Sequence, residues 1–173
     1  FKTAYLHTQI NQEEVKSDIE SLIYTGDYFA MQSESKKQII QKMKNNPDPY
    51  IFYVREHLYL PEDKETLSVS EDTLYYYCSL IGVLFEIGNQ EAKDIIMQEY
   101  NKQKNLLEIY ENEEKTMRNT VPYNEWEIVE DAVSNLYGVQ TCIISKFENY
   151  HDTSIVTDCL DRFDKLNAIF GFN

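Results

Sequence analysis

Apolar residues recur at helical spacing along almost the whole chain. Near the start, Val15, Ile19 and Ile23 follow one another at intervals of four residues, and a similar period returns in most later segments. Such spacing places one apolar stripe along a helix. The chain lacks both the strand–helix–strand alternation of a parallel sheet and the Asn-Gly or Asp-Gly signal of a hairpin. The sequence therefore predicts an all-α fold, an irregular bundle of about seven helices in a single domain over 1–173, which also permits helical-repeat-like pairing.

Capping residues and prolines predict the helix boundaries in the first part of the chain. Asn11 is suited to cap the first helix, because its short side chain can accept a hydrogen bond from an unpaired backbone N–H. Asp48 as N-cap and Pro49 at the first helical position predict the start of the third, although the aromatic and β-branched run that follows also permits a strand. The expected ranges are 11–26, 27–45 with an optional break at Ser33, and 48–60.

The rest of the chain is expected to contain a linker, further helices and one undecided segment. The polar stretch 61–69 is expected to be a mobile connection. Ser70 and Asn89 are suited to cap the next two helices, and Gly88 to end the first of these. The β-branched run 139–144 fits either a buried helix or a short strand, because so short a run has no decisive period. The remaining expected helices cover 70–88, 89–115, 122–138, with Gly138 either ending or kinking the helix, and a last one from Asp152 or Thr153, with a turn at 118–121.

The cysteines and the apolar segments indicate where the protein functions. Cys78, Cys142 and Cys159 are far apart and form no Cys-x-x-Cys pair, which excludes a zinc knuckle and argues against a disulfide framework. They are expected to pack as small apolar residues in a reducing compartment. The longest apolar run, around 74–87, is too short to span a bilayer, and the start lacks the apolar core of a signal peptide. We therefore expect a cytoplasmic protein.

The charge of the chain excludes one class of function and favours another. Acidic side chains number 30 and basic ones 16, a formal net charge of −14. A general nucleic-acid surface is excluded, since phosphate backbones are bound by positive charge, and a basic partner is expected. The acids are densest on both sides of the turn at 118–121, where antiparallel helices would bring them together at one end of the bundle. They are Glu108, Glu111, Glu113 and Glu114 before the turn, and Glu125, Glu127, Glu130 and Asp131 after it.

In its overall character, the chain resembles bacterial immunity proteins, which neutralise the toxins of contact-dependent growth inhibition and related polymorphic toxin systems. Many of these are small, acidic proteins and some are all-α. The resemblance implies a cytoplasmic inhibitor that covers the active site of a basic toxin, expected to be a nuclease, with acids that mimic phosphates and aromatic anchors between them. It implies no catalytic residue, cofactor or metal, and neither a membrane nor a nucleic acid as a direct partner; the oligomeric state stays open. The expected contact residues are Glu108, Glu111, Glu114, Tyr123, Glu125, Trp126, Glu130 and Asp131.

Two other functions are compatible with the same residues. Glu108 and Glu111 form an E-x-x-E motif, and carboxylates at this spacing share a helix face on which they can bind magnesium. With Glu130 and Asp131 on the next helix, the pattern resembles that of all-α nucleotide pyrophosphatases of the MazG kind, although those enzymes have E-x-x-D in the second helix. The third hypothesis is a helical-repeat protein-binding scaffold, which predicts a concave aromatic groove.

Overall fold

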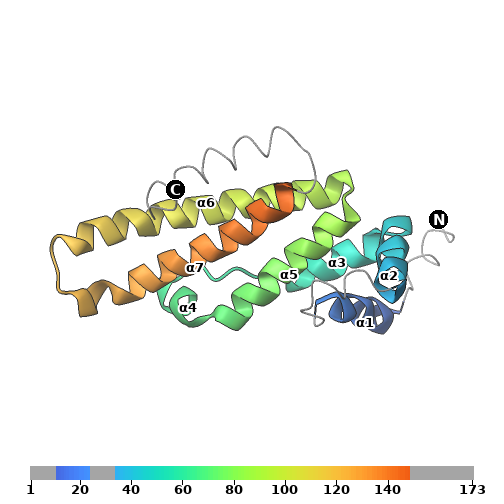
Figure 1. The fold of residues 1–173 in the computed structure, drawn as a ribbon, viewed down its shortest axis with the longest axis horizontal. Coiled ribbons are helices and arrows are strands. Elements are labelled where there is room, and N and C mark those ends of the chain that lie inside the picture. The colour runs from blue at the N-terminus through green and yellow to red at the C-terminus, as the bar shows by residue number, and fades with distance from the viewer. Residues whose placement is uncertain (1–10, 24–33, 149–173) are drawn as a thin grey trace. The chain divides into compact units, whose positions relative to one another are not determined.

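Helices make up the regular structure throughout the part of the chain that can be described. The computed structural model describes residues 11–23 and 34–148, with side chains to residue 143. Within these residues there are seven helices and no strand (Figure 1), which confirms the all-α class. The positions of Gly26, Ser33 and Cys159 and the predicted last helix lie outside the described residues. The helices are α1 (Gln12–Ile23), α2 (Glu34–Asn45), α3 (Asp48–His57), α4 (Lys64–Val69), α5 (Glu71–Ile87), α6 (Gln90–Arg118) and α7 (Tyr123–Glu148).

The described helices group into two compact units. One unit holds α1, α2 and α3, together with α5 from Ser79 and α6 as far as Gln98. The other holds α4 and α7, with α5 as far as Cys78 and α6 from Glu99. Helices α5 and α6 therefore contribute to both units, and the expectation of a single domain over 1–173 stays a prediction.

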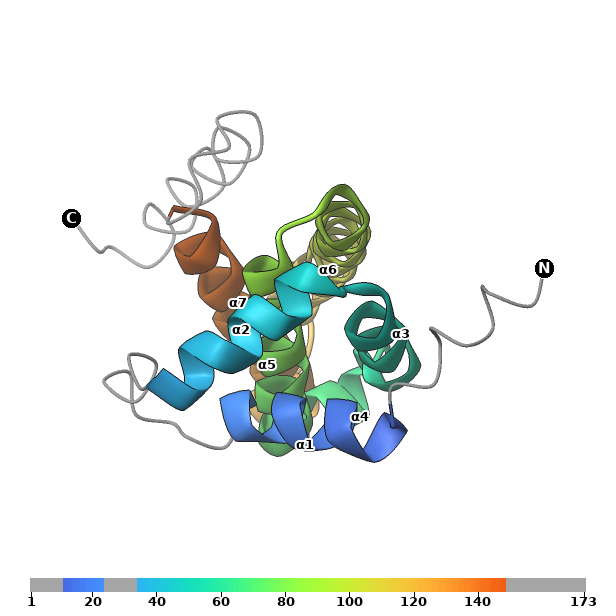
Figure 2. The same cartoon turned by 90° about the vertical axis from the view of Figure 1, so that its right-hand side faces the viewer.

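In the first unit, α1 packs against both α2 and α3 (Figure 2). The predicted cap is present, since the Asn11 side chain accepts a hydrogen bond from the Glu13 backbone N–H at 3.1 Å. Val15, Ile19 and Ile23 are buried, as their spacing predicts. Burial of an aliphatic side chain of this size contributes about 1.5–3 kcal/mol to stability, so this stripe is what holds α1 in the unit.

A polar network ties α1, α2 and α3 together. The fully buried Tyr50 of α3 donates its hydroxyl to Asp18 Oδ2 of α1 at 2.6 Å. Lys42 of α2 forms ion pairs with the same carboxylate at 2.8 Å and with Glu14. The hydrogen bond to Asp18, followed by that to Glu14, raises the pKa of Lys42. Asp18 therefore serves two partners that are distant from it in sequence.

The boundaries of α3 differ from the predicted ones. Pro47, rather than Asp48, is the N-cap, because its carbonyl accepts the first hydrogen bond of the helix from Ile51 N at 2.9 Å; its own backbone lies at φ −73° and ψ −28°. Asp48 and Pro49 consequently lie in the first turn. The helix ends at His57 instead of Leu60, because Leu58 is extended. The alternative of a strand here is wrong.

The stretch 61–69, predicted as a mobile linker, instead contains α4 in the second unit, packed against α7. Asp63 caps this helix by accepting a hydrogen bond from Thr66 N at 2.8 Å, and the fully buried Leu67 anchors it. The Asn135 amide of α7 donates to the Leu67 carbonyl at 2.8 Å. A good cap, one buried apolar residue and the contacts from α7 therefore form a helix where the segment is mostly polar.

The long helices begin close to their predicted starts, whereas α7 runs well past its predicted end at Gly138. Gly88 ends α5 with φ +66°, a backbone conformation that favours glycine, and Asn89 caps α6 by accepting from Ala92 N at 2.9 Å. Helix α6 runs to Arg118, three residues beyond the prediction, and α7 begins at Tyr123, directly after Pro122. Helix α7 then continues without interruption through 139–144, so that segment is helical.

Candidate partner-binding site

The predicted acidic site lies where α6 and α7 meet in an antiparallel hairpin (Figure 1). Arg118, the last residue of α6, lies between acids from both helices. Its Nε and Nη2 atoms donate to Glu114 Oε1 at 2.9 and 2.6 Å, and Nη2 also reaches Glu130 Oε1 at 3.3 Å. Two of the predicted acids therefore converge, as expected from the antiparallel arrangement, but they converge on a cation.

Two aromatic residues from the first turn of α7 complete this group. The rings of Tyr123 and Trp126 meet edge to face, with centroids 4.7 Å apart and planes at 90°. The Arg118 guanidinium lies over the indole, 4.8 Å from the ring centroid, within the range of a cation–π contact. Tyr123 is 54% exposed and Trp126 is half-buried, so part of this aromatic surface is open to solvent. We call Glu114, Arg118, Tyr123, Trp126 and Glu130 the hairpin tip.

The electrostatics of the hairpin tip remain negative despite the arginine. The hydrogen bond between the Tyr123 hydroxyl and Glu130, together with the nearby charges of Glu130, Glu127 and Asp131, raises the pKa of Tyr123. The hydroxyl therefore keeps its proton and is engaged with Glu130 rather than open to a partner. One cation faces two paired carboxylates and the further acids on α7. The net local charge is therefore negative, and such a surface attracts basic groups.

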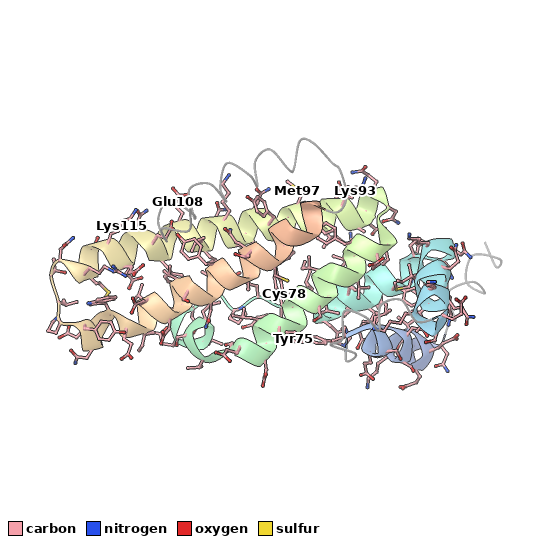
Figure 3. The ribbon with its side chains drawn as sticks, in the orientation of Figure 1. Tyr75, Cys78, Lys93, Met97, Glu108 and Lys115 are labelled. Atoms are coloured by element: carbon pink, nitrogen blue, oxygen red, sulfur yellow. The ribbon has the colours of Figure 1, made fainter. Side chains whose placement is uncertain are left out.

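The other predicted contact residues lie outside this group. Glu125 and Asp131 are exposed on α7 and form no ion pair within the described residues. Glu111 is half-buried on α6. Glu108 is exposed on the outer edge of α6, on the same side as Lys115 (Figure 3). Because Glu108 precedes Arg118 by ten residues, it lies about 15 Å along the helix from the hairpin tip, beyond the reach of direct contact.

The residue that organises the hairpin tip, Arg118, is absent from the predicted set. In the sequence it is the first residue of the expected turn, where one of a few cations among many acids gives little reason to assign it a role. One signal was present: Glu114 and Arg118 are four residues apart, the spacing at which an acid and a base interact on a helix. That signal depends on α6 continuing to Arg118, which the predicted end near residue 115 does not include.

The arrangement gives no support to the magnesium hypothesis. Among the described residues, no group of three or more acidic, histidine or cysteine side chains is placed to hold a metal ion. Glu108 and Glu111 do not join Glu130 in a common cage, since Glu130 interacts with Arg118 instead.

None of the helices in the described ranges is both long and apolar enough to cross a membrane. Cys78 and Cys142 are half-buried thiols.

Comparison of the chain with protein-family models, with curated proteins and with solved structures found no match.

Proposed function

We propose that this protein is an immunity-type inhibitor that binds a basic toxin, expected to be a nuclease, through the hairpin tip and the exposed acids beside it. The observation that carries this proposal is the partly exposed Tyr123–Trp126 pair, which is set among carboxylates at the end of a helical hairpin. Tyrosine, tryptophan and arginine are the residue types most enriched at the energetic centres of protein interfaces.

Three features make the hairpin tip suited to a protein partner. The aromatic pair is held in one orientation by Arg118, which lowers the entropy lost when a partner orders these side chains. Glu125 and Asp131 lie nearby on α7 without an ion-pair partner among the described residues, so their charges are available to a cationic surface. The net charge of −14 attracts such a surface from a distance and raises its association rate.

Charge reversal beside the aromatic pair tests the proposal. The protein is immobilised and used to capture basic proteins from the cell that encodes it, and any captured protein is assayed for nuclease activity with and without the free inhibitor. The variant Glu125→Lys with Asp131→Lys is expected to weaken binding roughly tenfold or more, because it replaces attraction by repulsion.

A second double variant serves as the matched control. Asp72→Lys with Asp94→Lys makes the same change in net charge on exposed positions of α5 and α6. It is expected to retain most of the affinity. Equal losses in the two variants would show that the partner responds to net charge alone, and capture of an active nuclease that the protein does not inhibit would overturn the inhibitor function.

A further inference from the structure

A groove runs between α1 and α3 in the first unit, with a volume of about 940 Å³. Its floor includes Val15 and Ile51, which are only 3% and 2% exposed, and its rim carries Phe52, whose surface is 58% exposed. An open volume of this size is typical of a site that holds a ligand or a peptide side chain.

The sequence of α3 explains why aromatic surface faces this groove. Tyr50, Ile51 and Val54 are buried in the unit, so the helix turns Phe52 away from them and toward solvent. Beside Phe52 on the same helix, the rings of Tyr53 and His57, one turn apart, stack with their centroids 4.0 Å apart and planes at 17°. Both residues also line the groove. Helix α3 therefore presents three ring-bearing side chains to the groove, of which Phe52 and His57 are exposed and Tyr53 is half-buried.

The polar rim of the groove is negative. Glu13, Asp48 and Glu56 line it, and within the described residues none of the three forms an ion pair. The rim also carries two cations: Lys16 lies 3.9 Å from Glu20 at the surface, and Arg55 pairs at 3.0 Å with Glu91, a further rim acid. Acids therefore outnumber cations on the rim, which favours positive groups from outside.

We propose that this groove is the docking site of a basic amphipathic peptide segment from another protein. Its apolar side chains would occupy the floor beside Phe52, and its lysines or arginines would face Glu13 and Glu56. An amphipathic segment laid between two helices is a recurrent mode of peptide recognition, and the combination of apolar floor and acidic rim selects a cationic segment over an acidic one. The inference is independent of the inhibitor function, because none of its residues belongs to the hairpin tip.

The test uses a fluorescent synthetic peptide of lysine and leucine arranged as an amphipathic helix, titrated with the full chain and followed by anisotropy. One reference peptide replaces each lysine by glutamate, and another replaces each leucine by glutamine. The lysine–leucine peptide is expected to bind, more weakly as salt is raised, and the two references are expected not to bind. Equal binding of the leucine-free peptide would overturn the proposal, since the attraction would then be charge alone.

Variants assign the binding to the groove. Phe52→Ser is expected to weaken binding about tenfold or more, and Glu13→Lys with Glu56→Lys to remove most of it together with its salt dependence. Val69→Ser on α4, at a position 80% exposed, is the control for loss of exposed apolar surface and is expected to bind like the wild type.

Two further outcomes separate this site from its alternatives. Unchanged affinity in Phe52→Ser, or a loss of binding only in Tyr123→Ala, would place the peptide elsewhere and overturn the proposal. The protein could instead form a concentration-dependent dimer that Phe52→Ser dissociates, and bind no peptide. That result would identify a second copy of this chain as the occupant of the groove and would also overturn the proposal. The peptide experiment requires no natural partner, so an absence of peptide binding would leave the proposed inhibitor function unaffected. In the same way, a failure to find a toxin partner would leave the proposed peptide groove unaffected.

Discussion

At the scale of single residues, stability in the second unit depends on polar groups placed in the core. Tyr77 is 1% exposed, and its hydroxyl donates to Glu99 Oε2 at 2.7 Å while accepting from Gln103 Nε2 at 2.6 Å. Burial, followed by the charge of Glu99, raises the pKa of Tyr77 far above its ordinary value. These contacts link residues more than twenty positions apart, so helical periodicity predicts that Tyr77 is buried but cannot predict its partners.

The network around Tyr77 predicts a dependence of stability on alkaline pH. Above pH 10.0, the ordinary tyrosine pKa, the unfolded chain releases a proton that folded Tyr77 retains, so the free energy of unfolding falls as pH rises. Tyr77→Phe is expected to lower stability by about 1–3 kcal/mol at neutral pH and to make the alkaline decline shallower. Urea unfolding of both proteins across this pH range measures the two effects, and identical alkaline slopes would contradict the assigned role of Tyr77.

At the scale of secondary-structure elements, most helices were predictable and α4 was not. The apolar stripe of α1, the caps at Asn11 and Asn89 and the glycine after α5 are local signals, which the structure confirms. Helix α4 has only one fully buried apolar residue, Leu67, and is held by contacts from α7 and from Tyr110, whose hydroxyl donates to the Glu62 carbonyl. Tertiary contacts of this kind have no signature in the segment itself.

The anchoring of α4 can be tested by removing its one buried side chain. Leu67→Ala is expected to lower the free energy of unfolding by about 2–5 kcal/mol, because it leaves a cavity against α7. Val69→Ala, in the same helix but 80% exposed, is expected to change it by less than about 0.5 kcal/mol. Chemical denaturation of the two variants measures both changes. In a mobile linker, as the composition predicts, both substitutions would change the free energy of unfolding equally little.

The candidate site was predictable in part, for reasons that also belong to helix geometry. Glu114, Trp126 and Glu130 were placed together correctly, because antiparallel helices bring the residues that flank a turn to one end. Glu108 was included on charge density alone, and its position along α6 separates it from the hairpin tip. The groove between α1 and α3 was not predictable, because its walls come from helices whose relative placement is absent from the local sequence pattern.

At the scale of the whole molecule, the excess of negative charge is the property with the widest consequences. A net charge of −14 makes the folded chain repel itself, and this repulsion is strongest when salt is low. We expect the melting temperature to rise as sodium chloride is increased from about 10 mM to about 150 mM, over which the Debye length falls from roughly 30 Å to 8 Å. Thermal unfolding followed by circular dichroism measures this shift; a lower melting temperature at the higher salt would show that attractive ion pairs outweigh the repulsion.

The same charge underlies the proposed binding of a basic toxin, and one affinity comparison tests that claim most directly. With the captured basic partner in hand, its dissociation constant is measured at about 150 mM salt for the wild type, for Glu125→Lys with Asp131→Lys, and for Asp72→Lys with Asp94→Lys. Binding weakened roughly tenfold or more in the first double variant, and nearly unchanged in the second, is the predicted result. Equal affinity in all three proteins would contradict a binding surface formed by the hairpin tip and the exposed acids beside it.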